Sequence, residues 1–214
     1  MSGRVTALEP QRRSRDRVNV YLDGEFAFGL ARAAAVNLSV GVWLSDEQIA
    51  RLRADDELER ARAKALDFLS YRPRSAEEVR EYLERKHFRS DIIEDIMARL
   101  RGVGLIDDQA FAQYWVDNRT RFRPRGARLL RHELRQKKVA PEAIEAALEA
   151  YDERTALMLA AEQQARRLRH LPEEQFRRRL FQRLARRGFS YELIQEALAD
   201  CDLPYTHREQ SEED

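Results

Sequence analysis

An internal repeat of about fifty residues is the feature that most constrains how this chain can fold. Residues 83–88 carry a basic turn between apolar anchors, with further apolar residues at helical spacing behind it. The same pattern returns 51 residues later at 134–139, and 50 residues after that at 184–189. Units of this length bury apolar faces against their neighbours, so we expect a mainly α chain. The predicted fold is a series of tandem three-helix repeats forming an elongated solenoid, with a small N-terminal β-hairpin region.

Helix-start signals stand at matching places in the repeat. Ser75 is followed three residues later by Glu78, which is the pattern of a capping box. Ser90 is predicted to cap the next helix. Asp107-Asp108 is expected to open another, with one carboxylate as the N-cap at the positive end of the helix dipole. A metal-binding or acid–base pair is the alternative interpretation of these two residues.

The N-terminal part has the alternation of β-strands. Residues 17–22 and 25–30 alternate apolar and polar side chains around Asp23-Gly24, a pair that favours a tight hairpin turn. Residues 5–8 are a candidate third strand. Each hairpin strand is expected to place three apolar side chains on one face, namely Val18, Val20 and Leu22 on the first and Phe26, Phe28 and Leu30 on the second.

The chain divides into five predicted segments. Ser45 begins a helix towards Arg53, and Asp55-Asp56 marks the end of the first module. The expected boundaries are 1–55 for the β-hairpin with short helices, 56–105, 106–151 and 152–201 for the three repeats, and 202–214 for an acidic tail.

Several classes of protein are excluded by what the sequence lacks. It has no apolar run long enough for a transmembrane helix, and its one cysteine, Cys201, fits a reducing cytoplasm. Neither zinc-ligand spacing nor a glycine-rich nucleotide loop is present. We therefore expect a cytoplasmic protein that is not an enzyme and has no cofactor, no metal and no catalytic residues.

The net charge of +1 conceals two basic segments. Residues 119–138 hold nine Arg or Lys against one Glu, and residues 164–189 hold nine Arg against two Glu. Such gathering is typical of a surface that binds a polyanion or an acidic protein. The alternative is a set of solvated helix faces in an arginine-rich composition, because the chain has 35 Arg and only 4 Lys.

Two Arg-Pro-Arg connectors stand at equivalent points of successive repeats. They cover residues 72–74 and 123–125, again 51 residues apart. Proline fixes the backbone of each corner, so two guanidinium groups flank a rigid bend. Guanidinium groups suit phosphates and carboxylates, although here they are equally interpretable as solvated side chains beside a helix stop.

The residues of the first two repeats resemble those of RecX proteins. The resemblance is carried by ALDFLSYRPRS at 65–75, EVREYL at 78–83 and GLIDDQAFA at 104–112, with 126–134 fitting the second repeat of that family. It extends over about residues 58–200, and the hairpin also occurs in longer members. The chain departs from the pattern in two ways: the third repeat has no Arg-Pro-Arg connector, and Lys138 stands where the third repeat has Gly188.

RecX-like proteins are bacterial regulators of the RecA recombinase. The resemblance implies a protein that binds the groove of the RecA filament on single-stranded DNA. It would inhibit RecA ATP hydrolysis, strand exchange and coprotease activity, and so modulate recombination and DNA repair. The implied partners are RecA and its filament, with weaker direct DNA binding, no membrane, and a monomeric state. The alternative is a general DNA-binding helical-repeat protein that competes for single-stranded DNA.

The predicted binding residues are basic side chains of the connectors and of the two basic segments. Their density and repeated placement suggest them as the RecA- or DNA-binding surface: Arg72, Arg74, Arg119, Arg121, Arg123, Arg125, Arg128, Arg131, Arg135, Lys137, Arg179 and Arg183.

Overall fold

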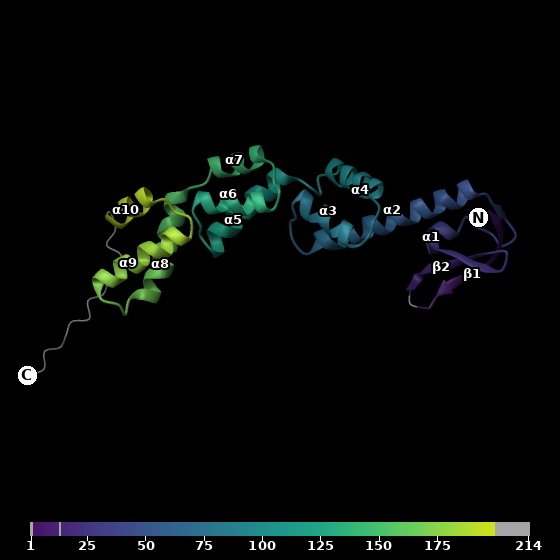
Figure 1. Cartoon of the computed structure of the whole chain (residues 1–214), viewed down its shortest axis with the longest axis horizontal. Coiled ribbons are helices and arrows are strands. Elements are labelled where there is room, and N and C mark those ends of the chain that lie inside the picture. The colour runs from purple at the N-terminus through teal and green to yellow at the C-terminus, as the bar shows by residue number, and fades with distance from the viewer. Residues whose placement is uncertain (1, 13, 200–214) are drawn as a thin grey trace, which may run out of the picture. The chain divides into compact units, whose positions relative to one another are not determined.

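The computed structural model describes residues 2–12 and 14–199 of the chain. Cys201 and the predicted acidic tail lie outside the described residues. Three strands, the short helix α1 (Arg32–Ala35) and a two-residue fourth strand precede the remaining helices, as Figure 1 shows for the labelled elements. The described residues fall into two compact units, one drawn from residues 2–72 and 79–106 and one from residues 73–78 and 107–199. Three-helix repeats behind an N-terminal strand region confirm the predicted fold class.

The N-terminal strands form one antiparallel sheet in the order β3-β2-β1-β4. Its strands are β1 (Gly3–Gln11), β2 (Ser14–Leu22), β3 (Glu25–Ala31) and β4 (Trp43–Leu44). Asp23 and Gly24 both have positive φ, of 50° and 90°, which confirms the predicted hairpin turn. The candidate third strand is confirmed as β1, whereas the two-residue β4 had no signal in the sequence.

Phe26 does not share the buried face of β3, contrary to the prediction. Its side chain is 60% exposed, while Phe28 and Leu30 are buried. The pairing of β2 with β3 is irregular between Val20 and Tyr21, where the register steps from Phe28 to Phe26 and skips Ala27. The extra residue, Ala27, breaks the alternation along β3, so Phe26 before it lies on the other face of the sheet from Phe28.

A single helix, α2 (Asp46–Ser70), joins the strand region to the first repeat. Ser45 caps it in the predicted capping box, but the helix does not stop near Arg53 and runs unbroken through Asp55-Asp56. Asp56 is buried, accepts the backbone N–H of Ala31 at 2.7 Å and forms an ion pair with Arg17 at 2.9 Å. The residue expected at a module boundary therefore fixes the helix to the sheet, because a buried carboxylate must be paired.

The first repeat consists of the end of α2 with α3 (Ala76–Arg85) and α4 (Ser90–Gly102). The Ser75 capping box is confirmed, since Ser75 Oγ accepts the backbone N–H of Glu78 and the Glu78 side chain accepts the N–H of Ser75. Ser90 is not the N-cap of α4, contrary to the prediction. It is the first helical residue, and Arg89 before it has the extended backbone of the N-cap position.

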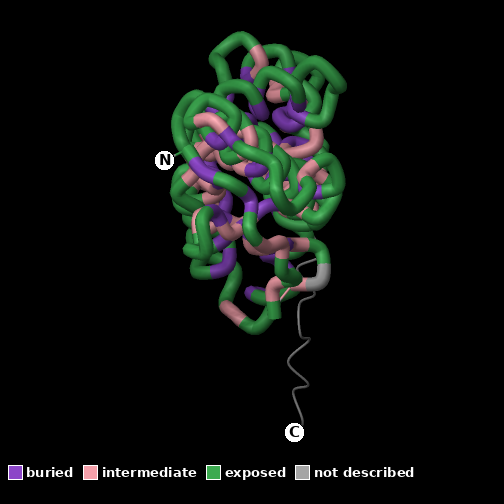
Figure 2. Tube along the Cα trace, turned by 90° about the vertical axis from the view of Figure 1, so that its right-hand side faces the viewer, coloured by how far each residue is buried: buried purple, intermediate pink, exposed green. Residues whose placement is uncertain are grey.

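Two further repeats follow with the same helix order. The second contains α5 (Asp108–Phe122), α6 (Ala127–Gln136) and α7 (Pro141–Glu149), and the third contains α8 (Glu153–Leu168), α9 (Glu173–Arg186) and α10 (Tyr191–Ala199). Each has its own apolar core. Buried residues recur along the trace among exposed ones, as Figure 2 shows.

The turn after the second helix has the same backbone in every repeat. His87, Lys138 and Gly188 all have positive φ, of 60°, 54° and 89°. This left-handed residue precedes the buried or half-buried anchors Phe88, Val139 and Phe189. The repeat read from the sequence is therefore a repeat of backbone geometry as well.

Candidate functional site

The two Arg-Pro-Arg connectors lie against the turns that close the second helix of the following repeat. The Ser75 hydroxyl donates to the carbonyl of Lys137 at 3.0 Å. At the equivalent place, the backbone N–H of Gly126 donates to the carbonyl of Arg187 at 2.9 Å. We name these contacts the first junction (73–78 with 108–138) and the second junction (124–129 with 153–190). Both lie within the second compact unit.

An acidic side chain caps the connector helix at each junction. The backbone N–H of Ala76 donates to Asp108 Oδ1 at 2.8 Å, and that of Ala127 donates to Glu153 Oε1 at 3.0 Å. In both cases the acidic residue belongs to the first turn of the next repeat. A backbone N–H that has no partner within its own helix therefore donates to a carboxylate of another helix. Asp107 is the N-cap of α5, which confirms the structural interpretation of the Asp pair.

The second junction brings two backbones into direct contact, and two glycines make this possible. A Cβ on Gly126 would lie 2.2 Å from the carbonyl oxygen of Gly188. A Cβ on Gly188 would lie 2.5 Å from the Cβ of Leu129. Gly188 also has φ of 89°, a conformation that side chains disfavour. Direct backbone contact thus replaces the serine hydroxyl of the first junction.

Glu133 gathers three donors beside the first junction. The Glu133 side chain is 12% exposed. Its carboxylate accepts hydrogen bonds from Trp115 Nε1 and from Arg119 Nε, both at 2.8 Å, and it forms an ion pair with Arg125 Nη1 at 2.6 Å. Arg119 also lies over the Trp115 ring at 4.1 Å. Lys137 forms an ion pair with Glu78 at 2.6 Å. The predicted binding residues Arg119, Arg125 and Lys137 therefore have structural partners.

Two more of the predicted residues hold neighbouring helices together. Arg131 of α6 pairs with Glu145 of α7 at 2.7 Å. Hydrogen bonding between them raises the pKa of Arg131 and lowers the pKa of Glu145. Arg183 of α9 donates to the Gln164 Oε1 of α8 at 3.1 Å. Arg72 and Arg74 are partly buried in the first connector.

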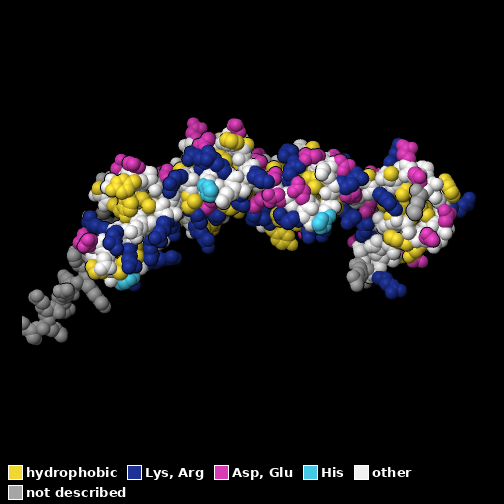
Figure 3. All heavy atoms as spheres, viewed as in Figure 1, with side chains coloured by type: hydrophobic (Ala, Val, Ile, Leu, Met, Phe, Trp, Pro, Cys, Tyr) yellow, Lys and Arg dark blue, Asp and Glu magenta, His cyan; other side chains and the backbone are white. Residues whose placement is uncertain are grey.

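The remaining predicted residues are exposed. Arg121 lies over the Phe122 ring, itself largely exposed, at 5.3 Å. Figure 3 shows Lys and Arg side chains gathered over α8 and α9. Within the described part of the chain, four predicted side chains have no hydrogen-bond or ion-pair partner: Arg123, Arg128, Arg135 and Arg179.

Arg167 and Arg187 belong to the second basic segment but were not among the predicted binding residues. Arg187 Nη1 donates to the carbonyl of Pro124 at 3.3 Å, so it lies directly beside the second connector. Burial, followed by repulsion from Arg125, Arg167, Arg123 and Arg183, lowers the pKa of Arg187. The available signal was the repeat itself, because Arg187 occupies the position that Lys137 has one repeat earlier.

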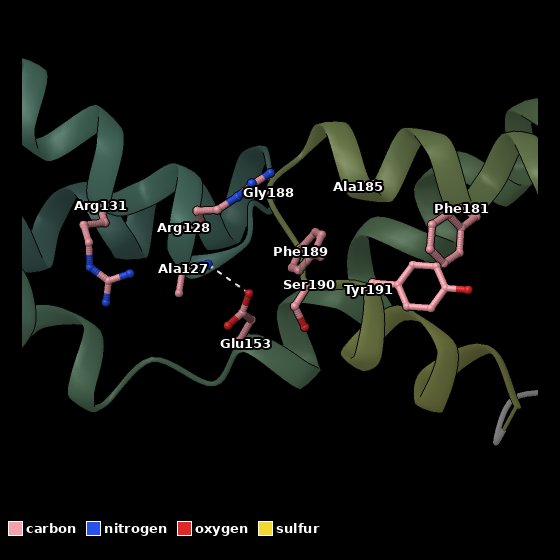
Figure 4. A pocket seen from close by; sticks show the side chains of 10 residues that line it. All are labelled: Ala127, Arg128, Arg131, Glu153, Phe181, Ala185, Gly188, Phe189, Ser190 and Tyr191. Atoms are coloured by element: carbon pink, nitrogen blue, oxygen red, sulfur yellow. Dashed lines mark hydrogen bonds between the residues drawn. The ribbon is translucent and has the colours of Figure 1, made fainter.

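A cavity of about 490 Å³ lies at the second junction. Figure 4 shows the Ala127–Glu153 hydrogen bond at its wall, with Arg128 and Arg131 on one side and the Tyr191 ring on the other.

Groups of three or more metal-ligating side chains do not occur among the described residues. Across the same residues, no helix is both long and apolar enough to span a membrane. Guanidinium groups are present at both junctions, and such groups bind anions.

Comparison with known proteins covers both the strand region and all three repeats. Residues 3–42 match the regulatory protein RecX N-terminal domain, and residues 61–100, 107–148 and 152–198 match the first, second and third three-helix domains of RecX. The regulatory protein RecX of Bacillus licheniformis is 30% identical over 92% of this chain and 77% of its own length. The chain belongs to the RecX family. The RecX protein of Limosilactobacillus reuteri is 32% identical over 90% of this chain and 76% of its own.

Solved RecX structures share the fold. A crystal structure of regulatory protein RecX superposes with a TM-score of 0.68 at 28% identity, covering 92% of this chain and all of its own. RecX from Lactobacillus salivarius gives 0.61 at 26% identity, covering 70% of this chain and 99% of its own.

Proposed function

We propose that this RecX-family protein regulates RecA by binding its nucleoprotein filament. In this proposal it inhibits RecA ATP hydrolysis, strand exchange and coprotease activity. The observation that carries the proposal is the match of all four RecX domains in order along the chain. The expected setting is the cytoplasm, and the expected partners are RecA and the single-stranded DNA within its filament.

The exposed arginines supply the surface for such binding. Arg123, Arg128 and Arg135 come from the second connector and α6, and Arg179 comes from α9. Their guanidinium groups are available to phosphates of DNA or carboxylates of RecA. Arg119, Arg125 and Lys137 contribute mainly by shaping the surface, since each already has a carboxylate partner.

Inhibition of this kind needs no chemistry in the regulator. A filament turns over ATP through changes in the arrangement of its protomers. A ligand that prefers one arrangement shifts the population towards it by its differential affinity. Binding along several protomers would thus slow hydrolysis with few regulator molecules per filament.

The test is single-stranded-DNA-dependent ATP hydrolysis by the cognate RecA, with this protein titrated in. We expect inhibition at ratios well below one molecule per RecA protomer. The double variant Arg123→Glu, Arg128→Glu should need a roughly ten-fold higher concentration for half inhibition, because two exposed contacts become repulsive. Unchanged inhibition by this variant would remove these residues from the surface, and no inhibition by the native protein would end the proposal.

A matched control reverses two exposed arginines outside the predicted set. Arg32→Glu with Arg101→Glu changes the net charge by the same amount at exposed positions. We expect it to inhibit like the native chain. Loss of inhibition in both double variants would show that net charge alone governs binding.

The second candidate function is competition for single-stranded DNA without contact to RecA. The exposed arginines of α9 favour it, because a basic helix face can follow a nucleic-acid backbone. Inhibition that appears only as the DNA becomes saturated with this protein would support this second function over the first.

A further inference from the structure

The cavity at the second junction has aromatic rings on one side and arginines on the other. The Tyr191 ring at the start of α10 meets the Phe181 ring of α9 edge to face, with the two ring centroids 4.9 Å apart. Tyr191 is 57% exposed, so much of this apolar surface is uncovered. Figure 4 places Arg128 and Arg131 of α6 across the cavity from Tyr191. An occupant with both apolar and acidic side chains would match the two sides.

The lining of the cavity carries more positive than negative charge. It includes two arginines and one acidic residue, Glu153, whose carboxylate accepts the backbone N–H of Ala127 at 3.0 Å. Arg131 forms an ion pair with Glu145 of α7. Arg128 is exposed and has no hydrogen-bond or ion-pair partner among the described residues. Arg128 is therefore the lining residue that an acidic occupant would pair with.

The chain itself contains a segment of this composition in residues 200–214, which we call the C-terminal segment. It holds six Asp or Glu against one Arg, whereas residues 1–199 hold 38 Arg or Lys against 32 Asp or Glu. The acidic C-terminal segment thus offsets most of the positive charge of the rest of the chain. Leu203 and Tyr205 on either side of Pro204 add apolar side chains. The C-terminal segment therefore offers both kinds of side chain that would match the cavity.

The C-terminal segment begins close enough to the cavity to return to it. Helix α10 starts in the cavity wall at Tyr191 and ends at Ala199, about 12 Å further along the helix axis. An extended chain spans about 3.3 Å per residue, so about four residues cover this distance. Leu203 is the fourth residue after Ala199. Because the C-terminal segment is tethered to α10, its effective concentration at the cavity is on the order of millimolar.

We propose that the C-terminal segment docks in the second-junction cavity of its own chain. Its apolar side chains pack against the two rings, and its acidic residues pair with Arg128. Docking covers part of the exposed basic surface of α6, so the C-terminal segment competes with any anionic partner of that surface. Such a partner binds with an affinity reduced by the fraction of molecules that are undocked. The docking itself does not depend on the proposed function, whereas its effect on RecA rests on it.

The docking is tested by comparing backbone amide signals of full-length variants by nuclear magnetic resonance. The first variant combines Leu203→Ser with Tyr205→Ser. We expect the amide signals of Arg128 and of other cavity residues to shift, because the substituted side chains contact them. The control Gln210→Ser changes the C-terminal segment without removing an apolar or acidic side chain, and should leave the cavity signals in place. Shifts confined to the neighbours of residues 203 and 205 in the sequence would overturn the proposal.

The reciprocal variant is Arg128→Gln, and its matched control is Arg166→Gln. Both arginines are exposed and both substitutions remove one charge, but only Arg128 lines the cavity. We expect Arg128→Gln, and not Arg166→Gln, to shift the signals of residues 209–214. Equal shifts with both variants would mean general attraction to a basic chain and would overturn the proposal. Shifts that vanish on dilution would mean docking on a second copy, which also overturns it. Thermal unfolding verifies that each variant is folded.

The effect on RecA is measured with the same full-length variants. Leu203→Ser with Tyr205→Ser should inhibit RecA ATP hydrolysis at a roughly five-fold lower concentration than the native chain, as for docking in about four fifths of the molecules. Equal inhibition by the two chains would overturn the competition. Shifted cavity signals without inhibition by the native chain leave the docking standing and end the RecA proposal. Native inhibition with unshifted cavity signals has the opposite meaning.

Discussion

Each of the two junctions donates a hydrogen bond to a turn carbonyl of the next repeat, but their charged side chains are paired differently. In the first, Lys137 pairs with Glu78 and Lys138 pairs with Glu77, both at 2.6 Å. One repeat later the two glutamate positions are occupied by Arg128 and Leu129, and Lys137 is replaced by Arg187. The two lysines of the first junction are thus paired with carboxylates, while Arg187 of the second junction has no carboxylate partner among the described residues. Successive repeats can therefore keep the same packing at their junctions while the charged residues around the junction differ. This difference in charge makes the second junction, and not the first, a candidate binding surface.

The largest expected effect comes from the backbone contact of the second junction. Gly126→Ala should lower the free energy of unfolding by about 3 kcal/mol, because the added methyl group collides with the Gly188 backbone. The φ and ψ of Gly126, −67° and 154°, are open to alanine, so the effect is steric alone. Urea denaturation measures it. Gly102→Ala, with no atom near its added Cβ, is the control and should be at least as stable as the native protein, because alanine is favoured over glycine in a helix.

Adding a carboxylate beside Arg187 should reduce the positive charge of the second junction. Leu129→Glu places an acid where the first junction has Glu78, within reach of Arg187 by repeat equivalence. We expect the affinity of this protein for a single-stranded oligonucleotide to fall roughly ten-fold, about 1.4 kcal/mol, because the added carboxylate pairs with Arg187 and repels phosphates. Anisotropy titration at moderate salt checks it. Leu129→Gln is the uncharged control, and an equal loss with glutamine would show that packing and not charge is responsible.

The caps supplied from the next repeat should have smaller and similar effects. Asp108→Ala and Glu153→Ala each remove the acceptor of one helix-start N–H. We expect each to cost about 1 kcal/mol of unfolding free energy, the usual value for a lost N-cap. Thermal and urea unfolding measure both. If only one of the two substitutions destabilised the protein, the equivalence of the junctions would fail.

The smallest effect is expected at a surface pair that the first two repeats share. Arg80 contacts Glu94, and Arg131 contacts Glu145 at the equivalent positions. Glu94→Gln and Glu145→Gln should each change the unfolding midpoint less than the loss of a cap does, since exposed ion pairs contribute little to stability. High salt should reduce even that change. A shift as large as that of Asp108→Ala would contradict this ranking.

Local patterns in the sequence predicted much of the fold. The turn at Asp23-Gly24, the capping boxes at Ser45 and Ser75 and the three matching turns all depend on residues close together in the chain. The errors arose where distant parts of the chain decide. A bulge against β2 turned Phe26 outwards, and contacts with the sheet made Asp56 the centre of a continuous helix.

The candidate site was predicted only in outline. The sequence indicated where basic residues gather and that they repeat, but it could not show which of them are neutralised. Glu133 of α6, for example, forms ion pairs with Arg119 of α5 and with Arg125 of the second connector. Lys137 forms an ion pair with Glu78, which lies 59 residues earlier in the chain.

The sequence by itself determined the repeat, its register, the buried face of each helix and the RecX family, because all of these are periodic or local properties of the chain. The tertiary structure alone decided which arginines remain without a carboxylate, how acids of one repeat cap helices of another, and why Gly126 and Gly188 must be glycine. The physical reason is distance along the chain. Charge and close packing depend on neighbours in space, and at the junctions these neighbours are brought together only by folding.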